Sequence, residues 1–245
     1  MEQSETNAKV DNSPQPIASW KHLAGFLLIG AGVVTMGFLA QTAPSGAQPA
    51  GQLASHSQAI PVYLVAIFMD WALLYYCWGG VRHRGGTLEM LSGGRWTSWG
   101  SLAVDLGIAV PFWALWEAAD YGVSRLLGPS GAKTVDSLLP KSFLEVLIWI
   151  GASITAGFCE EIVFRGYLQR QIRALSGSVL AAVLGQGLVF GLFHSYQGWK
   201  NVVVIGVLGV LYGMLAAWRG NLRVNIVSHA ATDIWEGWLK FVVWR

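Results

Sequence analysis

Seven apolar segments alternate with short polar ones along the chain, and their lengths predict a set of long helices. The segments lie near residues 23–40, 60–81, 99–119, 143–164, 178–196, 200–218 and 222–243. A helix of about 20 residues rises about 30 Å, enough to cross a bilayer once. The pattern therefore predicts an all-α, polytopic membrane helix bundle with about seven to eight transmembrane helices, the eighth arising if one segment is broken.

The composition agrees with this class of protein. Hydrophobic residues make up 53% of the chain and charged residues only 12%, whereas a soluble domain carries about 25% charged residues. The net charge of +2 gives no indication of a nucleic-acid partner, and none is expected. The two cysteines, Cys77 and Cys159, lie in apolar segments and form neither a disulfide framework nor a zinc motif. The expected partners are membrane lipid and a membrane-associated protein or peptide.

The division into domains is simple. Residues 1–22 are polar, contain no apolar core and are predicted to be a disordered N-terminal tail rather than a signal peptide. Residues 23–245 are predicted to be a single transmembrane domain. The loops Thr42–Gln52 and Gly128–Gly131 are short. Loop Thr42–Ser57 contains no Lys or Arg, so basic residues favour a multi-pass protein of the cell membrane with a cytoplasmic N-terminus.

Ionisable side chains inside predicted spans are candidates for function by default, because burying them in hydrocarbon is costly. Four of them, Asp70, Asp105, Glu117 and Glu145, are isolated in the sequence. For these four the structural interpretation is favoured: hydrogen bonds between helices, or positions near the membrane interface.

The stretch Gly157–Gln171 separates two adjacent glutamates into different roles. Glu161 and Arg165 are spaced i,i+4 with the acid first, which is the favourable order for an ion pair on one helix face. Glu160 lies about 100° further round the helix and has no partner in its own segment. We therefore predict a supporting pair of Glu161 and Arg165, and Glu160 as a general base.

Two further segments carry histidines. His229 and Asp233 are also spaced i,i+4 and project from one face of the last predicted helix. His194 ends an apolar segment. If Ser176–Ser178 is the turn of a helical hairpin, Glu160 and His194 lie level, each about 25 Å from that turn. Glu160, His194, His229 and Asp233 are then predicted to lie at similar depth on the cytoplasmic side.

A carboxylate, two histidines and a further acid in a wet pocket can hydrolyse an amide. Glu160 would take a proton from water that His194 orients, and His229 with Asp233 would stabilise the tetrahedral oxyanion. Alternatively, Glu160, His194, His229 and Asp233 could hold one divalent metal, such as zinc, that polarises water. The residues by themselves leave the cofactor unknown, either none or one such metal, and the sequence lacks the HExxH motif of zinc proteases.

Three motifs in order resemble those of a known family. "EEIVFR" resembles EExxxR, "FGLFH" resembles FxxxH and "HAATD" resembles HxxxN/D. Together, over about residues 143–235, they resemble the CPBP family, which contains the CAAX prenyl endopeptidases of the Ras-converting type and bacteriocin-immunity relatives. The resemblance implies an intramembrane endopeptidase with a cavity open toward the cytosol. It implies Glu160 and His194 for water activation, His229 and Asp233 for the oxyanion site, and Glu161 and Arg165 in support.

One position departs from the family pattern, since the eukaryotic CAAX enzymes have asparagine where this chain has Asp233. An ionised aspartate would repel an oxyanion, so Asp233 must be protonated, orient His229 or bind a metal. The metal-free mechanism is the one that the resemblance implies, and the metalloprotease remains its alternative. The substrate of such a protease would be a membrane-associated protein, with a prenylated CAAX-type protein as one option. The alternatives to a protease are a non-catalytic immunity or scaffold protein and a proton-coupled transporter.

Overall fold

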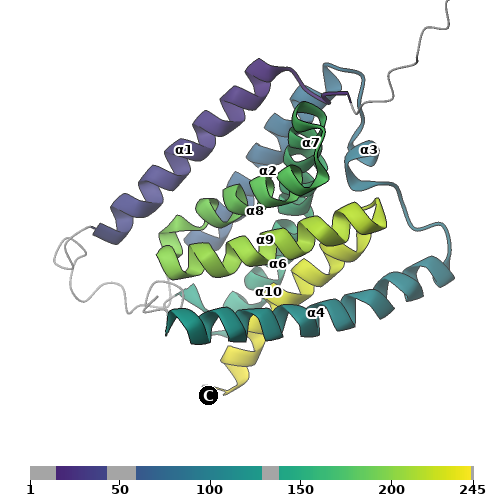
Figure 1. The fold of residues 1–245 in the computed structure, drawn as a ribbon. Coiled ribbons are helices and arrows are strands. Elements are labelled where there is room, and N and C mark those ends of the chain that lie inside the picture. The colour runs from purple at the N-terminus through teal and green to yellow at the C-terminus, as the bar shows by residue number, and fades with distance from the viewer. Residues whose placement is uncertain (1–14, 43–58, 129–137, 244–245) are drawn as a thin grey trace, which may run out of the picture.

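The computed structural model describes residues 15–42, 59–128 and 138–243, and helices are its only regular elements over these ranges (Figure 1). The elements, in chain order, are α1 (Trp20–Thr42), α2 (Ala59–Arg82), α3 (Leu88–Ser92), α4 (Trp99–Leu127), α6 (Phe143–Glu160), the π-helix η1 (Glu161–Gln169), α7 (Arg170–Ser176), α8 (Val179–Phe193), the 3₁₀ turn η2 (Ser195–Gln197), α9 (Trp199–Arg219) and α10 (Arg223–Val243). The predicted loops Thr42–Ser57 and Gly128–Gly131 lie almost wholly outside the described residues.

The predicted all-α membrane bundle is confirmed, with a different count of spans. Each of the seven apolar segments is a helix. Five of the described helical stretches are long and apolar enough to cross a membrane: Trp20–Gln41, Ala59–Arg82, Trp99–Leu127, Phe143–Ser176 and Trp199–Arg219. Helix α8 is only 15 residues long, about 22 Å, and α10 carries His229, Asp233 and Glu236, so neither meets this criterion.

Helices α6, η1 and α7 form one continuous helical stretch. Ser142 caps its start, and Glu145 accepts hydrogen bonds from the Lys141 and Ser142 backbone amides at 2.7 and 3.0 Å, so Glu145 is structural, as predicted. The stretch ends at Gly177, whose positive φ of 68° suits a residue without a side chain. The predicted turn at Ser176–Ser178 is confirmed. All nine residues of η1 are buried, and π-helical turns are frequent at functional sites.

Helices α8 and α9 pack against each other as a close antiparallel pair. The reason is glycine: a Cβ on Gly191 would lie 2.4 Å from the Val202 carbonyl oxygen, and one on Gly209 would lie 2.8 Å from the Gly187 Cα. Small residues let helix backbones approach closely where no hydrophobic effect drives them together. This close contact brings the turn after α8, which begins with His194, back into the bundle.

Helix α10 packs against α6, and α4 runs alongside α9 and crosses α10 (Figure 1). At the α6–α10 contact, a Cβ on Gly157 would lie 2.7 Å from the Ala230 backbone nitrogen. At the α4 contact, Asp105 accepts from Arg219 at 2.7 Å and from Arg223 at 2.8 Å. Asp105 is therefore a structural acid, as its isolation in the sequence predicts.

Helix α1 lies against the rest of the bundle at both of its ends. Gln171 accepts hydrogen bonds from the Ile17 and Ala18 backbone amides at 2.9 and 3.1 Å and donates to the Ala18 carbonyl at 2.8 Å. These residues were assigned to the disordered tail, so the ordered part of the chain begins earlier than residue 23. Residues 1–14 of that tail lie outside the described residues. Near its other end, Ser195 Oγ donates to the Val34 carbonyl at 3.1 Å.

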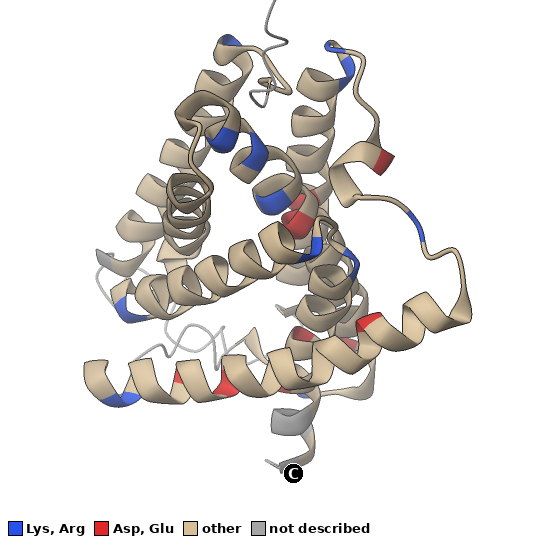
Figure 2. Ribbon diagram, turned by 45° about the vertical axis from the view of Figure 1, so that its right-hand side comes forward, with Lys and Arg blue, Asp and Glu red and all other residues tan. Residues whose placement is uncertain are grey.

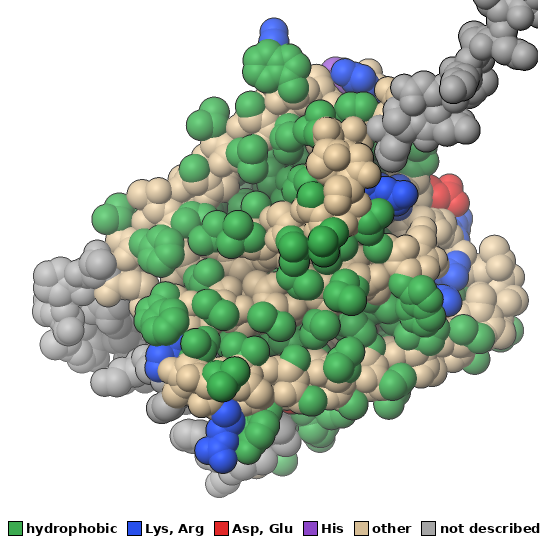
Figure 3. Space-filling view, viewed as in Figure 1, with side chains coloured by type: hydrophobic (Ala, Val, Ile, Leu, Met, Phe, Trp, Pro, Cys, Tyr) green, Lys and Arg blue, Asp and Glu red, His purple; other side chains and the backbone are tan. Residues whose placement is uncertain are grey.

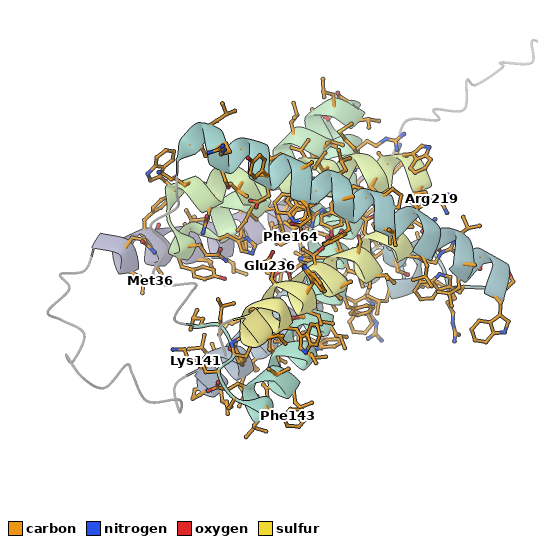
Figure 4. All side chains as sticks on the ribbon, turned by 90° about the horizontal axis from the view of Figure 1, so that it is seen from below. Met36, Lys141, Phe143, Phe164, Arg219 and Glu236 are labelled. Carbon is orange, nitrogen blue, oxygen red and sulfur yellow. The ribbon has the colours of Figure 1, made fainter. Side chains whose placement is uncertain are left out.

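The surface agrees with a membrane environment. Apolar side chains cover the face that carries α1, α8, α9 and α4 in Figure 3. These helices carry exposed large apolar side chains, among them Leu28 and Met36 of α1, Leu184 of α8 and Met214 of α9. Most basic residues lie in the upper half of the bundle in Figure 2, the half that holds the start of α1. Figure 4, viewed from below, shows Phe164 in the middle of the bundle and Met36 and Arg219 at opposite sides.

Candidate active site

Glu161 lies at the centre of a buried polar network. Its Oε1 accepts from Arg165 Nη1 at 2.8 Å and from His229 Nδ1 at 2.9 Å, and its Oε2 accepts from Asn225 Nδ2 at 3.0 Å. The side chains of Glu161 and Arg165 are both 0% exposed. The predicted Glu161–Arg165 pair is therefore confirmed, and the structure adds that the same carboxylate holds a histidine.

Arg165 extends this network to α8 and α9. Its guanidinium lies 4.3 Å from the ring centre of Phe190 and 5.2 Å from that of Tyr212, and its Nη2 donates to the Gly209 carbonyl at 3.3 Å. A cation over aromatic faces is stabilised most where water is absent. Arg165 thus compensates the charge of Glu161 and joins three helices around it.

His229 has a defined orientation. Because the Glu161 carboxylate can only accept, His229 Nδ1 carries the proton of that hydrogen bond. The imidazole ring stacks on Tyr212, with 5.4 Å between the ring centres and 26° between the planes. His229 Nε2 then points the other way, 3.8 Å from Glu160 Oε2 and 3.8 Å from Asp233 Oδ2. The structure therefore brings three of the four predicted catalytic residues around one ring nitrogen.

Glu160 differs from its neighbour as the sequence predicts. Its Oε2 is buried and has no hydrogen-bond partner among the described atoms, while its side chain is 18% exposed. A buried polar atom without a partner in a native structure asks for an explanation. The unpartnered Oε2 marks Glu160 as a candidate functional residue.

His194 reaches the same region from the end of α8. Its Nδ1 lies 2.9 Å from the Phe190 carbonyl oxygen. Because a carbonyl only accepts, Nδ1 carries the proton and Nε2 is left as an acceptor. The charges of His229 and Asp233 act on His194, and the same two act on Glu160. The Phe190 ring contacts both His194 and His229, with 4.9 and 6.0 Å between ring centres, and the common level of His194 and Glu160 stays a prediction.

The sequence motifs did not single out several residues of this region. Asn225 and Tyr212 belong to none of the three motifs and carry no charge. Asn225 nevertheless donates to Glu161, and Tyr212 stacks on His229. A signal existed in α10, because polar residues recur at i, i+3, i+4, i+7 and i+8, the spacing of one helix face. These are Asn225, Ser228, His229, Thr232 and Asp233.

Two other residues that interact with the site lie outside this face of α10. Asp70 of α2 interacts electrostatically with Glu160, His229 and Asp233, although its isolation in the sequence favoured a structural role. Tyr196 interacts with Glu160, Asp233 and Asp70. The Tyr196 ring also lines an apolar groove of about 540 Å³ along α1. None of the carboxylates is among the residues that line this groove.

The residues named as possible metal ligands do not form a ligand group. Among the described residues, no set of three or more His, Cys, Asp or Glu side chains is arranged to hold a metal ion. Glu160 Oε2 and Asp233 Oδ2 each lie 3.8 Å from His229 Nε2, but with His194 they form no such group among the described residues. The arrangement therefore does not fit a zinc site with three protein ligands.

Comparison with known proteins agrees with the three motifs. Residues 142–235 match the family described as Type II CAAX prenyl endopeptidase Rce1-like. The uncharacterized protein YpbD of Bacillus subtilis (strain 168) is 28% identical over 81 residues, which are 33% of this chain and 39% of YpbD. The matched part thus spans well under half of that relative. No solved structure matches. The family match confirms the CPBP resemblance of the segment that holds every predicted site residue.

Proposed function

Because residues 142–235 match the Type II CAAX prenyl endopeptidase family, we propose that this protein is an intramembrane endopeptidase acting on a membrane-associated protein. A prenylated CAAX-type substrate is the one that the family match favours. The proposal rests chiefly on one observation. Glu160 has a buried oxygen with no hydrogen-bond partner among the described atoms, beside a histidine whose other nitrogen is held by Glu161.

In the proposed reaction Glu160 is the general base. Its carboxylate takes a proton from a water molecule, and His194 Nε2 accepts the other water hydrogen and so orients the attack. The oxygen of that water bonds to the scissile carbonyl carbon, and the carbonyl oxygen becomes an oxyanion. A positioned base of this kind contributes about 10²–10⁴-fold to a rate.

His229 is the proposed oxyanion donor. Its Nδ1–H is held by Glu161, so a second proton on Nε2 makes an imidazolium that can face the oxyanion. Asp233 and Glu160, each 3.8 Å from Nε2, stabilise that positive charge. Of the three roles open to Asp233, orientation of His229 is therefore the one that the distances favour.

The proposed orientation places the N-terminus and the site on the cytoplasmic side of a cell membrane. Most of the described basic residues lie in the upper half of the bundle in Figure 2, which holds the start of α1, and this supports the choice. Cytoplasmic segments carry an excess of Lys and Arg.

The decisive experiment uses purified protein in detergent micelles and an internally quenched, farnesylated CaaX peptide. Glu160→Gln is expected to reduce cleavage by about 100-fold or more while the thermal unfolding midpoint stays near that of the unaltered protein. The matched control is Glu117→Gln, an acid of α4 that lies outside the network. If Glu160→Gln cleaves as well as the control, the assignment is wrong. A Glu160→Gln protein that still binds an uncleaved partner would favour the immunity or scaffold role.

A further inference from the structure

Asp70 lies on the buried face of α2. The buried residues of this helix are Tyr63, Leu74, Cys77, Gly80 and Val81. Asp70 follows Tyr63 by seven residues and precedes Leu74 by four, so it belongs to the same helix face. The contacts of α2 are mainly with α6. A carboxylate therefore projects from α2 toward the helix that carries Glu160.

Aromatic pairs fix the level at which Asp70 meets α6. The ring centres of Tyr63 and Trp149 are 5.3 Å apart, and those of Trp71 and Phe158 are 5.9 Å apart. The two helices thus run parallel, with residue 71 beside residue 158. Asp70, one residue before Trp71, comes level with the last turn of α6, which ends at Glu160.

The charges around Asp70 come from three elements. Glu160 of α6 and the pair His229 and Asp233 of α10 act on it, and Tyr196 of η2 and Cys159 of α6 also sense its charge. No Lys or Arg ion pair reaches Asp70 among the described residues. Adjacent carboxylates in a site shielded from water do not all ionise together, and one of them keeps a proton.

After the water attack Glu160 holds one proton, and the leaving peptide nitrogen still needs one. Expulsion of a peptide nitrogen requires a proton on that nitrogen, and a separate acid is one way to supply it. Glu161 is fully engaged by Arg165, Asn225 and His229, so it is not available. Asp70 is the remaining carboxylate beside Glu160 that has no assigned task.

We propose that Asp70 is the general acid of this site, an inference that rests on the proposed endopeptidase function. Glu160 accepts the proton of the attacking water as the oxygen–carbon bond forms. The oxyanion then re-forms the carbonyl, the carbon–nitrogen bond breaks, and its electron pair takes the proton of the Asp70 carboxyl group. The products are a carboxyl group and an amine. Transfer of the proton held by Glu160 to the Asp70 carboxylate restores both groups.

The test compares two substrates that differ in their need for that proton. One is the quenched farnesylated CaaX peptide, and the other is the same peptide with a thioester in place of the scissile amide. A thiol has a pKa of about 8.5, so it leaves as a thiolate without a donor. Asp70→Asn keeps the shape of the side chain and removes the proton. Asp70→Glu restores an acid, and Glu117→Gln is the control.

For Asp70→Asn we expect amide cleavage to fall about 100-fold or more, thioester cleavage to fall less than about threefold, and Asp70→Glu to recover part of the amide rate. Equal losses on both substrates would show a structural role and overturn the proposal, as would an unchanged amide rate. Glu160→Gln is expected to lose cleavage of both the amide and the thioester peptide, because attack by water is common to the two reactions. If it loses neither, or if the unaltered protein cleaves neither, the proposed function itself fails.

Discussion

His229 Nδ1 lies 2.9 Å from Glu161 Oε1, across a gap of 68 residues in the chain. The sequence pairs Glu161 with Arg165 and pairs His229 with Asp233, and it offers no link between the two pairs. The hydrogen bond makes them one network. It fixes which nitrogen of His229 faces Glu160, so Glu161 both neutralises Arg165 and orients the His229 ring.

Glu161→Gln is expected to destabilise the protein and abolish cleavage. Removing one partner of a buried ion pair costs about 3–5 kcal/mol, because the other charge stays buried without compensation. The readouts are the thermal unfolding midpoint and peptide cleavage.

A second variant separates these two effects. Glu161→Leu combined with Arg165→Met removes both charges, so stability should partly return, while cleavage stays absent because His229 has lost its partner. The control is Glu89→Gln, an exposed acid of α3. Full cleavage by the double variant would refute the positioning role of Glu161.

Asp105→Ala is expected to destabilise the contact between α4 and the α9–α10 junction. Asp105 binds Arg219, Arg223 and the Trp96 indole nitrogen, the last at 2.9 Å. The arginine side chains are 23% and 18% exposed, so the loss should be smaller than the about 3–5 kcal/mol of a fully buried pair. Thermal unfolding measures it, with Glu117→Gln as the comparison. An unchanged midpoint would show that this cluster does not stabilise the fold.

Gly191→Ala should be strongly destabilising and Gly151→Ala should not. A Cβ at residue 191 would lie 2.4 Å from the Val202 carbonyl oxygen, a backbone atom that cannot move away on its own, whereas one at residue 151 would meet nothing within 4 Å. In an open helix position Ala is favoured over Gly by about 0.8–1.0 kcal/mol. Equal midpoints for the two variants would contradict the close packing of α8 on α9.

Cleavage is expected to persist after treatment with a divalent-metal chelator. The reason is that no group of three or more His, Cys, Asp or Glu side chains among the described residues is arranged to hold a metal ion. The measurement is the peptide cleavage rate before and after dialysis against the chelator. Loss of cleavage that added zinc restores would favour the metal-dependent mechanism instead.

Much of the fold follows from local physics that the sequence displays. Runs of apolar residues require their backbone groups to be paired internally in a membrane, so each becomes a helix. The i,i+4 spacing of Glu161 and Arg165 places them on one face, and Gly177 provides the turn that ends α7. These features depend on neighbouring residues only. The extent of α8 was harder to predict, because the apolar run continues into residues that form the turn after His194.

Only the tertiary structure decided which residues that are far apart in the sequence lie close together in the folded protein. Asp70 looked isolated because its neighbours, Glu160 and His229, lie far along the chain, and the level of α2 against α6 is set by ring contacts that no sequence spacing reveals. The spacing of polar residues in α10 could have pointed to Asn225, but its hydrogen bond to Glu161 exists only in the folded chain. By itself the sequence determined the helices, the Glu161–Arg165 pair and the candidate residues, since each depends on local spacing. Packing between helices determined the partners of each carboxylate, because burial and distance exist only once the chain is folded.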